Sequence, residues 1–357
     1  MRRLSVFAFV VSVLAAEVAQ AQILLGDGTT VVFATVGEAK PILTCRDDFV
    51  RCMSPFDRAA RMKTEKGVSE KDYLEFVGKN VLEWNDGEKR KVTLAFQGIQ
   101  TNLEGLSLPF PKQVLLVKTT GDEEGRAPYT RANVIILPKG EIATPTAKLR
   151  KTICHELFHI LSRANPELRE KLYLVIGFEK CDEVEFPSEL KSRKITNPDA
   201  PANDHCIRLT LQGKDGWAIP ILFSRAEKYD TARGGEFFDY LQFQFLVVEH
   251  QGKAHDAKPA YDGLKPRLVD LQQTSGFFEQ VGRNTEYIIH PEEILADNFA
   301  LLILEEHAAP SPGIIKKMKE VLKAKGTAEP NGPANESQPI RPETNSTPPA
   351  AASRRSP

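Results

Sequence analysis

The chain has 357 residues, of which 27% are charged, and its formal net charge at pH 7 is −1. This length is enough for one large domain or two lobes. The balanced charge argues against a protein that binds nucleic acid or an anionic membrane through its net charge, because both would require an excess of basic residues.

The amino terminus has the pattern of an export signal. Residues 1–21 begin with two arginines, continue through an apolar run that ends at Ala16, and finish in a small-x-small pattern at Ala21. The pattern predicts a signal peptide that is cleaved before Gln22, and therefore a secreted or periplasmic protein. Glu17 and the shortness of the apolar run argue against a membrane anchor, and no stable membrane insertion is expected elsewhere.

The elements expected first are short. Residues 22–60 carry only scattered apolar runs and are expected to be irregular. Ser69, followed three positions later by Asp72, resembles a capping box and predicts a helix through Trp84. Apolar runs that suit strands follow at 91–96, 113–118 and 133–137.

The most informative motif is His-Glu-x-x-His at 155–159. Residues four apart on a helix share one face, so His155 and His159 can offer two imidazole nitrogens to one Zn²⁺. Glu156 is then placed beside the metal, where it can take a proton from a metal-bound water. The alternative is an amphipathic helix that carries two histidines by accident.

The surroundings of the motif predict a helix with an apolar face. Thr144 is expected as the N-cap and Pro145 as the first helical residue, and Pro166 is expected to end the element. Leu157 and Phe158 separate the two histidines, so the imidazoles lie next to apolar side chains. They need hydrogen-bond partners or a metal, because an unpaired buried polar group costs about 1–3 kcal/mol.

A catalytic zinc site needs a third protein ligand and an open position for water. Glu167 and Glu170 follow the motif closely, but they lie in a polar run that is typical of a solvated helical turn. A second, strongly apolar helix is predicted from Pro291, and it carries Glu293 and Asp297 at i, i+4 spacing. Carboxylates on such a helix are expected to be paired or to coordinate a metal, so a pair of salt-bridge partners is the alternative.

Together, His155-Glu156-x-x-His159 and Glu293-x-x-x-Asp297 resemble the gluzincin class of zinc metallopeptidases, of which thermolysin is the best-known member. The residues from Glu293 to Phe299 are closer to the corresponding helix of the anthrax lethal factor type. The resemblance covers these two helices. It implies that Glu293 is the third ligand and that Asp297 accepts the free N–H of a ligand histidine.

Two points are left open beside this resemblance. Glu292 is the rival of Glu293, and because it points about 100° away on the same helix, only one of the two can face the metal. The gap between His159 and Glu293 is much longer than in thermolysin-like enzymes, so it must hold an insertion that brings the second helix back to the first.

The resemblance implies an α+β fold: a zincin-like catalytic domain over residues 22–325, with the active-site helix packed on a small mixed sheet. In zincin folds a strand near 133–137 forms the rim of the cleft and pairs with an extended substrate, although an ordinary interior strand is an equal alternative. Residues 180–285, approximately, are expected to form a β-rich insertion between the two metal-binding helices. Strands are predicted there at 206–211, 217–223 and 237–249, and a rigid turn at 197–201.

The developing oxyanion of the reaction needs a hydrogen-bond donor. Tyr287 and His290 stand just before the second helix, where a Tyr or His commonly has this role in gluzincins. The alternatives are a buried aromatic whose hydroxyl is bonded to backbone for Tyr287, and a helix cap for His290.

Five cysteines agree with export. We expect local disulfides between Cys45 and Cys52 and between Cys181 and Cys206 in an oxidising compartment. Cys154 is left over and is expected to be a small buried hydrophobe.

The chain is expected to end in a basic helix at 314–325 and a disordered tail at 326–357, which is rich in Pro, Ser, Asn and Ala. The tail contains two glycosylation sequons, at Asn335 and Asn345.

These patterns predict a secreted zinc metallopeptidase, specifically an endopeptidase with one catalytic Zn²⁺, Glu156 as general base, and a peptide or protein as substrate. Two other functions stay open: a non-catalytic binding protein on a zincin scaffold, and a zinc hydrolase that acts on a non-peptide amide such as a cell-wall link. The oligomeric state and the substrate preference are not predicted.

Overall fold

The computed structural model describes residues 23–25, 28–249 and 257–323. The predicted signal peptide at 1–21 and the predicted tail at 326–357 lie outside these residues. The chain divides into two units, Met1–Ala324 and Lys325–Pro357, and all described residues belong to the first. Within the three described ranges, no helix has the length and apolar character needed to cross a membrane.

Six short strands form a mixed sheet in the order β1-β2-β4-β6-β5, with β3 paired to β4. β2, β4 and β6 are parallel, and the other pairings are antiparallel. The strands are β1 Ile23–Leu24, β2 Thr30–Phe33, β3 Val81–Leu82, β4 Gln113–Thr119, β5 Tyr129–Arg131 and β6 Val134–Pro138. The strand predicted at 133–137 as the cleft rim is the interior strand β6, because β5 folds back along its outer side and forms the edge.

Alternate residues of this sheet enter two different apolar cores. Leu116 joins the core shared with α5 and α7, whereas its neighbour Val117 joins the core shared with α1, α2 and α4. The sheet is therefore covered by helices on both faces, as strands this apolar require. These helices and their neighbours are α1 Val36–Leu43, α2 Asp48–Cys52, α3 Pro55–Arg61, α4 Glu70–Asn80, α5 Asp86–Leu103, α6 Lys139–Ala143 and α7 Thr146–Ala164.

Two expectations for this region are wrong and one is confirmed. Residues 22–60 are not irregular, because three capped helices follow β2. The strand expected at 91–96 belongs to α5, whose buried residues Val92, Ala95, Phe96 and Ile99 recur at helical spacing. The capping box at Ser69 is confirmed, although α4 ends at Asn80, where the chain turns extended into β3.

A second sheet is entirely antiparallel and has seven strands in the order β11-β10-β9-β8-β15, with β14 on β10 and β7 on β8. Its strands are β7 Phe178–Lys180, β8 His205–Leu211, β9 Lys214–Ser224, β10 Leu241–Glu249, β11 Lys258–Pro259, β14 Leu268–Val269 and β15 Thr274–Ser275. Smaller elements accompany them: the hairpin β12 Tyr261–Asp262 with β13 Lys265–Pro266, α9 Ser188–Lys191, η3 Phe237–Tyr240, η4 Leu271–Gln273 and α10 Phe277–Val281. The start of the strand expected at 237–249 is the 3₁₀ turn η3.

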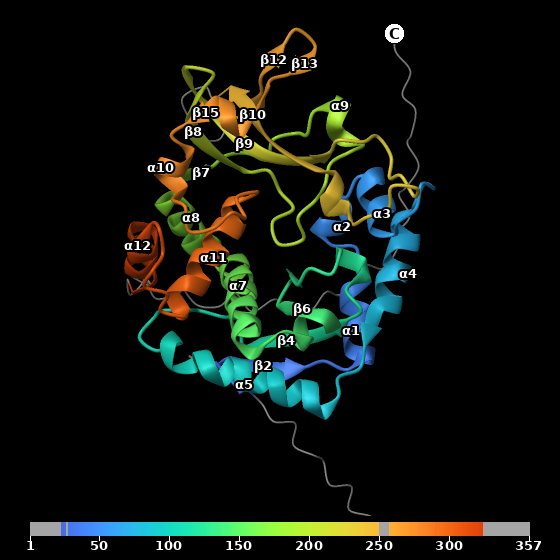
Figure 1. Ribbon diagram of the computed structural model, residues 1–357, viewed down its shortest axis with the longest axis vertical. Helices are drawn as coiled ribbons and strands as arrows, with labels where there is room; N and C mark the ends of the chain where they lie inside the picture. The colour runs from blue at the N-terminus through green and yellow to red at the C-terminus, as the bar shows by residue number, and fades with distance from the viewer. Residues whose placement is uncertain (1–22, 26–27, 250–256, 324–357) are drawn as a thin grey trace, which may run out of the picture. The chain divides into compact units, whose positions relative to one another are not determined.

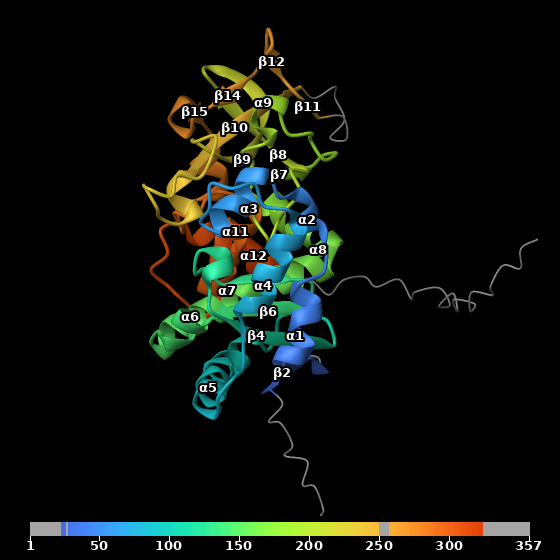
Figure 2. The same ribbon diagram turned by 90° about the vertical axis from the view of Figure 1, so that its right-hand side faces the viewer.

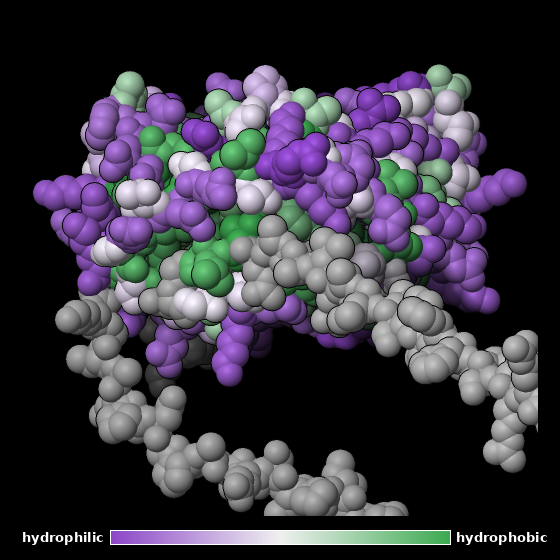
Figure 3. Space-filling model, turned by 90° about the horizontal axis from the view of Figure 1, so that it is seen from below, coloured by the Kyte–Doolittle hydropathy of each residue, from purple (hydrophilic) through white to green (hydrophobic). Residues whose placement is uncertain are grey.

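This second sheet lies in sequence between α8 (Pro166–Val175) and α11 (Pro291–Ile303), so the segment between the two motif helices is rich in β-structure, as predicted. Figure 1 shows this sheet above α7 and α11, and the six-stranded sheet below them. Figure 2 shows the same order after a quarter turn, with α12 (Pro312–Lys323) next to α11. Seen from below, hydrophilic side chains dominate and apolar ones form small patches between them (Figure 3).

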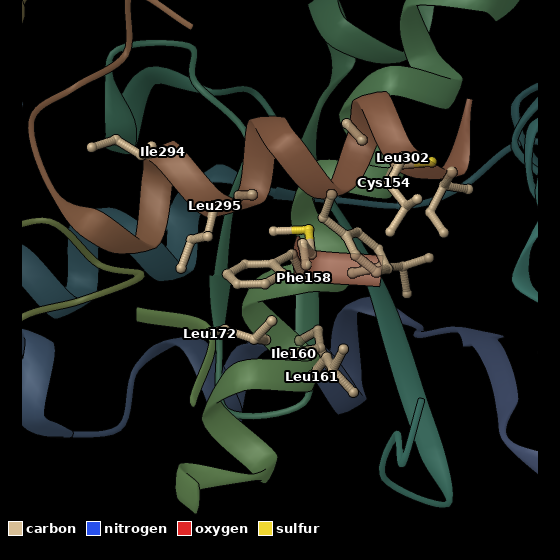
Figure 4. Packing of buried hydrophobic residues seen from close by; sticks show 14 of the residues in the cluster. Cys154, Phe158, Ile160, Leu161, Leu172, Ile294, Leu295 and Leu302 are labelled. Carbon is tan, nitrogen blue, oxygen red and sulfur yellow. The ribbon is translucent and has the colours of Figure 1, made fainter. Parts of the chain in front are cut away.

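The two motif helices are held together by an apolar contact. Phe158 of α7 lies 5.7 Å from Phe299 of α11, centroid to centroid. Figure 4 shows Phe158 and Cys154 beneath α11, which carries Leu295 and Leu302. Cys154 is fully buried, as predicted. This packing brings the two helices together across the long gap in sequence.

The structure holds all five cysteines as free thiols, so neither predicted disulfide is present in it. Cys45 is exposed ahead of α2 and Cys52 ends that helix, which separates them. Cys181 and Cys206 are both buried and their side chains share a hydrogen bond, which raises the pKa of the Cys181 thiol.

Candidate metal centre

Helix α7 presents the motif histidines toward α11. It begins at Thr146, one residue later than predicted, because Thr144 ends the short helix α6 and Pro145 occupies the N-cap. It ends at Ala164, just before Pro166 as expected, and Pro166 is the first residue of the next helix. His159 is 1% exposed, so its imidazole is enclosed by the two packed helices.

The ligand-type atoms of His155, His159 and Glu293 converge on one point. Nε2 of His155 lies 3.0 Å from Oε2 of Glu293, and Nε2 of His159 lies 3.7 Å from the same oxygen. The three residues together form a group that fits one metal ion. In a tetrahedral zinc site with bonds of about 2.0–2.2 Å, ligand atoms lie roughly 3.3 Å apart, a value that these two distances bracket.

Each imidazole is oriented by a carboxylate on its other nitrogen. Nδ1 of His155 lies 3.0 Å from Asp297, which also accepts the hydroxyl of Thr285. Nδ1 of His159 lies 3.0 Å from Glu292. An ionised carboxylate only accepts hydrogen bonds, so both Nδ1 atoms donate, and Nε2 is the nitrogen that each imidazole turns toward Glu293.

Glu292 and Glu293 therefore face different partners. Besides His159, Glu292 accepts hydrogen bonds from Ser162 and from the hydroxyl of Tyr173, the latter at 2.6 Å. Glu293 faces the two Nε2 atoms instead. Of the two rivals, Glu293 is the one that the structure places with both histidines.

The donor set suits a cation. Nε2 of His159 is buried and has no hydrogen-bond partner. With Nδ1 protonated, the Nε2 atoms and Glu293 place lone pairs against one another, which is unfavourable without a proton or a metal ion between them. Among the described residues, no lysine or arginine forms a salt bridge with Glu156, Glu292 or Glu293.

The pKa values of His155, His159 and Glu293 reflect the excess of carboxylates over cations in this site. Burial opposes the charge on His155, but the hydrogen bonds with Asp297 and Glu293 raise its pKa well above the usual value. Burial also opposes charge on His159, yet Asp199 and Glu293 raise its pKa to about 9. Burial acts against the ionised form of Glu293, but His159 and His155 lower its pKa to about 2. The neighbouring carboxylates therefore favour positive charge at the imidazole nitrogens.

Glu156 lies beside this cluster and is not part of it. Its side chain is 2% exposed, and Oε2 is buried with no hydrogen-bond partner. Burial, and then the Asp199 carboxylate, raise the pKa of Glu156 to about 8. A buried carboxylate with a free oxygen and a raised pKa is suited to accept a proton.

The turn at 197–201 supplies two site residues that the sequence reasoning missed. Asn197 donates to Oε1 of Glu293 at 2.6 Å, so Glu293 keeps Oε2 for the histidines. Asp199 accepts hydrogen bonds from the backbone N–H and the hydroxyl of Thr130 on β5. Asp199 also forms a second metal-compatible group with Glu156 and His159. The only signal was an Asn and an Asp on either side of Pro198, a pattern that is also common in solvated turns.

The two expected oxyanion donors lie in different places. Tyr287 is 39% exposed, and its ring lies 6.3 Å from the ring of His155 at an angle of 27°. It lines a cavity of about 420 Å³ together with Glu156 and Glu293. The expectation of a buried Tyr287 with its hydroxyl tied to backbone is not met.

His290 is the N-cap of α11, and its Nδ1 accepts the backbone N–H of Glu292 at 3.1 Å. It lines a different cavity of about 480 Å³, beside Tyr173 and Glu292. The structure therefore agrees with its alternative role as a helix cap.

Comparisons of the chain with models of protein families, with curated proteins and with solved structures give no match. The geometry of the site is therefore the basis for assigning a function.

Proposed function

We propose that the protein is a secreted or periplasmic zinc-dependent endopeptidase with a gluzincin-type site. His155, His159 and Glu293 would hold one Zn²⁺. The observation that carries this proposal is the convergence of two imidazole Nε2 atoms and one carboxylate oxygen next to the free oxygen of Glu156. The residues 1–21 pattern supports the location outside the cytoplasm.

When bound, a zinc ion supplies a Lewis acid that polarises a carbonyl group and lowers the pKa of water. Glu156 accepts the proton that the attacking water loses, and later returns it to the amine that leaves. Tyr287 is placed in the same cavity with its ring beside His155, so its hydroxyl is the donor that we assign to the developing oxyanion.

Asp297 and Glu292 keep both histidines in the tautomer whose Nε2 lone pair is available. Asn197 holds the second oxygen of Glu293 and thereby limits its rotation. The effect of these groups is to keep the ligand atoms in place before a metal arrives.

The test is Glu156→Gln, which keeps the shape of the side chain but removes the base. We expect the variant to retain about one zinc per chain and to lose hydrolysis of an unfolded protein substrate by at least about 100-fold. Metal content by atomic emission and cleavage by gel assay measure the two outcomes.

Glu167→Gln is the matched control, because Glu167 is exposed at the start of α8. It should retain both zinc and activity. Hydrolysis by Glu156→Gln at the wild-type rate would contradict the assignment of the base. A wild-type protein that holds zinc and cleaves no peptide would contradict the peptidase and favour a non-peptide amide as substrate.

A further inference from the structure

Two exposed aromatic side chains line the cavity at the candidate metal centre. Phe238 and Tyr287 are each 39% exposed. They come from η3 and from the loop before α11, so only the fold brings them together. Both line the cavity of about 420 Å³ that also contains His155, Glu156 and Glu293. Exposed apolar surface in a concave site is typical of ligand recognition.

Further apolar side chains accompany these rings. Phe238 and Tyr287 also line a second, smaller pocket of about 30 Å³, together with Ala127 and Pro128. This pocket is lined as well by the apolar residues Leu222, Phe237, Leu241 and Ile289, and by the polar residues Glu124, Thr196, Asn197 and Asp199. The larger cavity has Lys148, Lys151 and Thr152 of α7 in its lining. Phe238 and Tyr287 are the large aromatic residues common to both pockets.

The position of Phe238 is fixed by a buried support. Its ring lies 4.0 Å from the ring of Phe237, centroid to centroid, and the guanidinium of Arg61 lies 4.1 Å from the Phe237 centroid. Arg61 is itself fully enclosed and forms a hydrogen bond of 2.6 Å with Glu124. The backbone of Gly125 also lies close to Phe238: a Cβ there would lie 2.9 Å from the Phe238 ring, and its φ is +57°. The aromatic wall is thus preformed rather than loosely attached.

We propose that Phe238 and Tyr287 form a specificity subsite, which selects peptides with an aromatic or large aliphatic side chain next to the bond that is cleaved. This proposal rests on the proposed peptidase function. The occupant is a peptide side chain because the same cavity contains the general base, so a chain positioned for hydrolysis has to pass the aromatic wall. An apolar side chain placed there removes the exposed faces of both rings from water.

The test uses a peptide library to find the cleaved bonds, followed by two peptides that differ only in Phe or Ser beside the cleaved bond. We expect wild-type kcat/KM to favour the Phe peptide by about 10-fold or more. Phe238→Ala should reduce that ratio by about 10-fold while zinc content is retained. Ala127→Phe, which fills the cavity, should also reduce the preference for the Phe peptide over the Ser peptide. Because it changes a different residue, agreement between the two variants argues against misfolding as the cause.

Tyr261→Ala is the matched control, because Tyr261 is an aromatic residue that is 45% exposed on β12 and lines neither cavity. It should leave the ratio unchanged. Binding of both uncleaved peptides to Glu156→Gln, measured by fluorescence polarisation, gives a readout that does not need catalysis. There the Phe peptide should bind more tightly, and Phe238→Ala should abolish the difference.

The two proposals fail in different ways. If the wild type cleaves peptides without an apolar preference, or if Phe238→Ala keeps the wild-type ratio, the subsite is wrong and the peptidase stands. If the wild type cleaves no peptide, the peptidase is wrong. In that case, equal binding of the Phe and Ser peptides to Glu156→Gln would overturn the subsite as well.

Discussion

At the scale of single residues, the site depends on which nitrogen of each histidine is protonated. His155 and His159 donate from Nδ1 to carboxylates, so Nε2 is the nitrogen of each neutral ring that can bind a cation. His290 has the opposite role, because its Nδ1 must accept the N–H of Glu292, which requires the neutral ring. Burial, and then the nearby His205, lower the pKa of His290 to about 4. Three histidines in one region are thus held in their roles by burial and by their partners.

The cap predicts how stability depends on pH. An unfolded histidine titrates near pH 6.5, whereas His290 in the folded chain titrates near 4. The stabilisation is therefore complete above about pH 6.5 and is lost as the pH falls toward 4, by up to about 3 kcal/mol. His290→Asn keeps a capping acceptor but does not titrate. Urea unfolding of the metal-free protein at pH 7 and pH 4.5 should show a smaller loss in the variant than in the wild type.

Equal losses in the two proteins would contradict a neutral, capping His290. Using metal-free protein for both prevents acid release of a metal from adding to the difference.

At the scale of elements, α11 carries three carboxylates that contact the two histidines in three different ways. Glu292 orients His159, Glu293 faces both Nε2 atoms, and Asp297 orients His155. This is possible because positions 293 and 297 lie on one face of the helix, while position 292 points about 100° away, toward Tyr173 and Ser162. The helix as a whole is anchored by its apolar contact with α7. Helix α11 is therefore both a structural and an electrostatic partner of the motif.

Removing an orienting carboxylate should weaken metal binding without removing a ligand. Asp297→Ala is expected to lower zinc affinity by about 10–100-fold, because His155 loses the acceptor that fixes its tautomer. Asp297→Asn should have a smaller effect, since its side-chain oxygen still accepts from Nδ1. Competition with a chromophoric chelator measures both values.

Glu286→Ala is the control, because Glu286 is exposed in the loop just before α11. An affinity of Asp297→Ala equal to that of the control would show that Asp297 does not orient His155.

At the scale of the whole described structure, a buried ionic cluster joins the amino-terminal helices to the segment that enters the site. Arg61 of α3 bonds to Asp57 and Glu124, and it donates to the backbone oxygen of Thr196 at 3.0 Å. Asp57 accepts the backbone N–H of Thr196 at 2.9 Å. Thr196 directly precedes Asn197, which holds Glu293. The cluster thus positions the 197–201 turn from outside the candidate metal centre.

This arrangement predicts a large difference between two arginines. Arg61→Met should lower the free energy of unfolding by about 3–5 kcal/mol, because it leaves Asp57 and Glu124 buried without their cation. Arg46→Met removes an exposed pair with Glu70 and should cost at most about 1 kcal/mol. Urea unfolding at pH 7 measures both.

Adding Asp57→Asn and Glu124→Gln to Arg61→Met should recover part of the loss, because no unpaired charge then stays buried. Similar losses for the two single arginine variants would mean that the cluster does not stabilise the fold as proposed.

Local patterns predicted much of the site, but not all of it. The i, i+4 spacing of His155 and His159 and of Glu293 and Asp297 depends only on helix geometry, and both helices form where the periodicity indicated. The same reasoning misread 91–96, because a short apolar run suits a strand as well as a buried helix. The pattern at 133–137 left a rim strand and an interior strand as equal alternatives, since pairing between strands is a contact that no single strand encodes.

The amino-acid pattern alone was enough to indicate the two helices, the histidine pair and the carboxylates that could accompany it, because these follow from interactions within a few residues. Only the folded chain shows that Glu293 rather than Glu292 faces both histidines. It also shows that Asn197 and Asp199 lie at the site, and that Phe238 and Tyr287 line the same cavity. Each of these joins residues that are far apart in sequence. Their distances are set by the packing of α11 on α7 and by the buried contacts that hold the 197–201 turn. Such contacts produce no periodic pattern in the sequence.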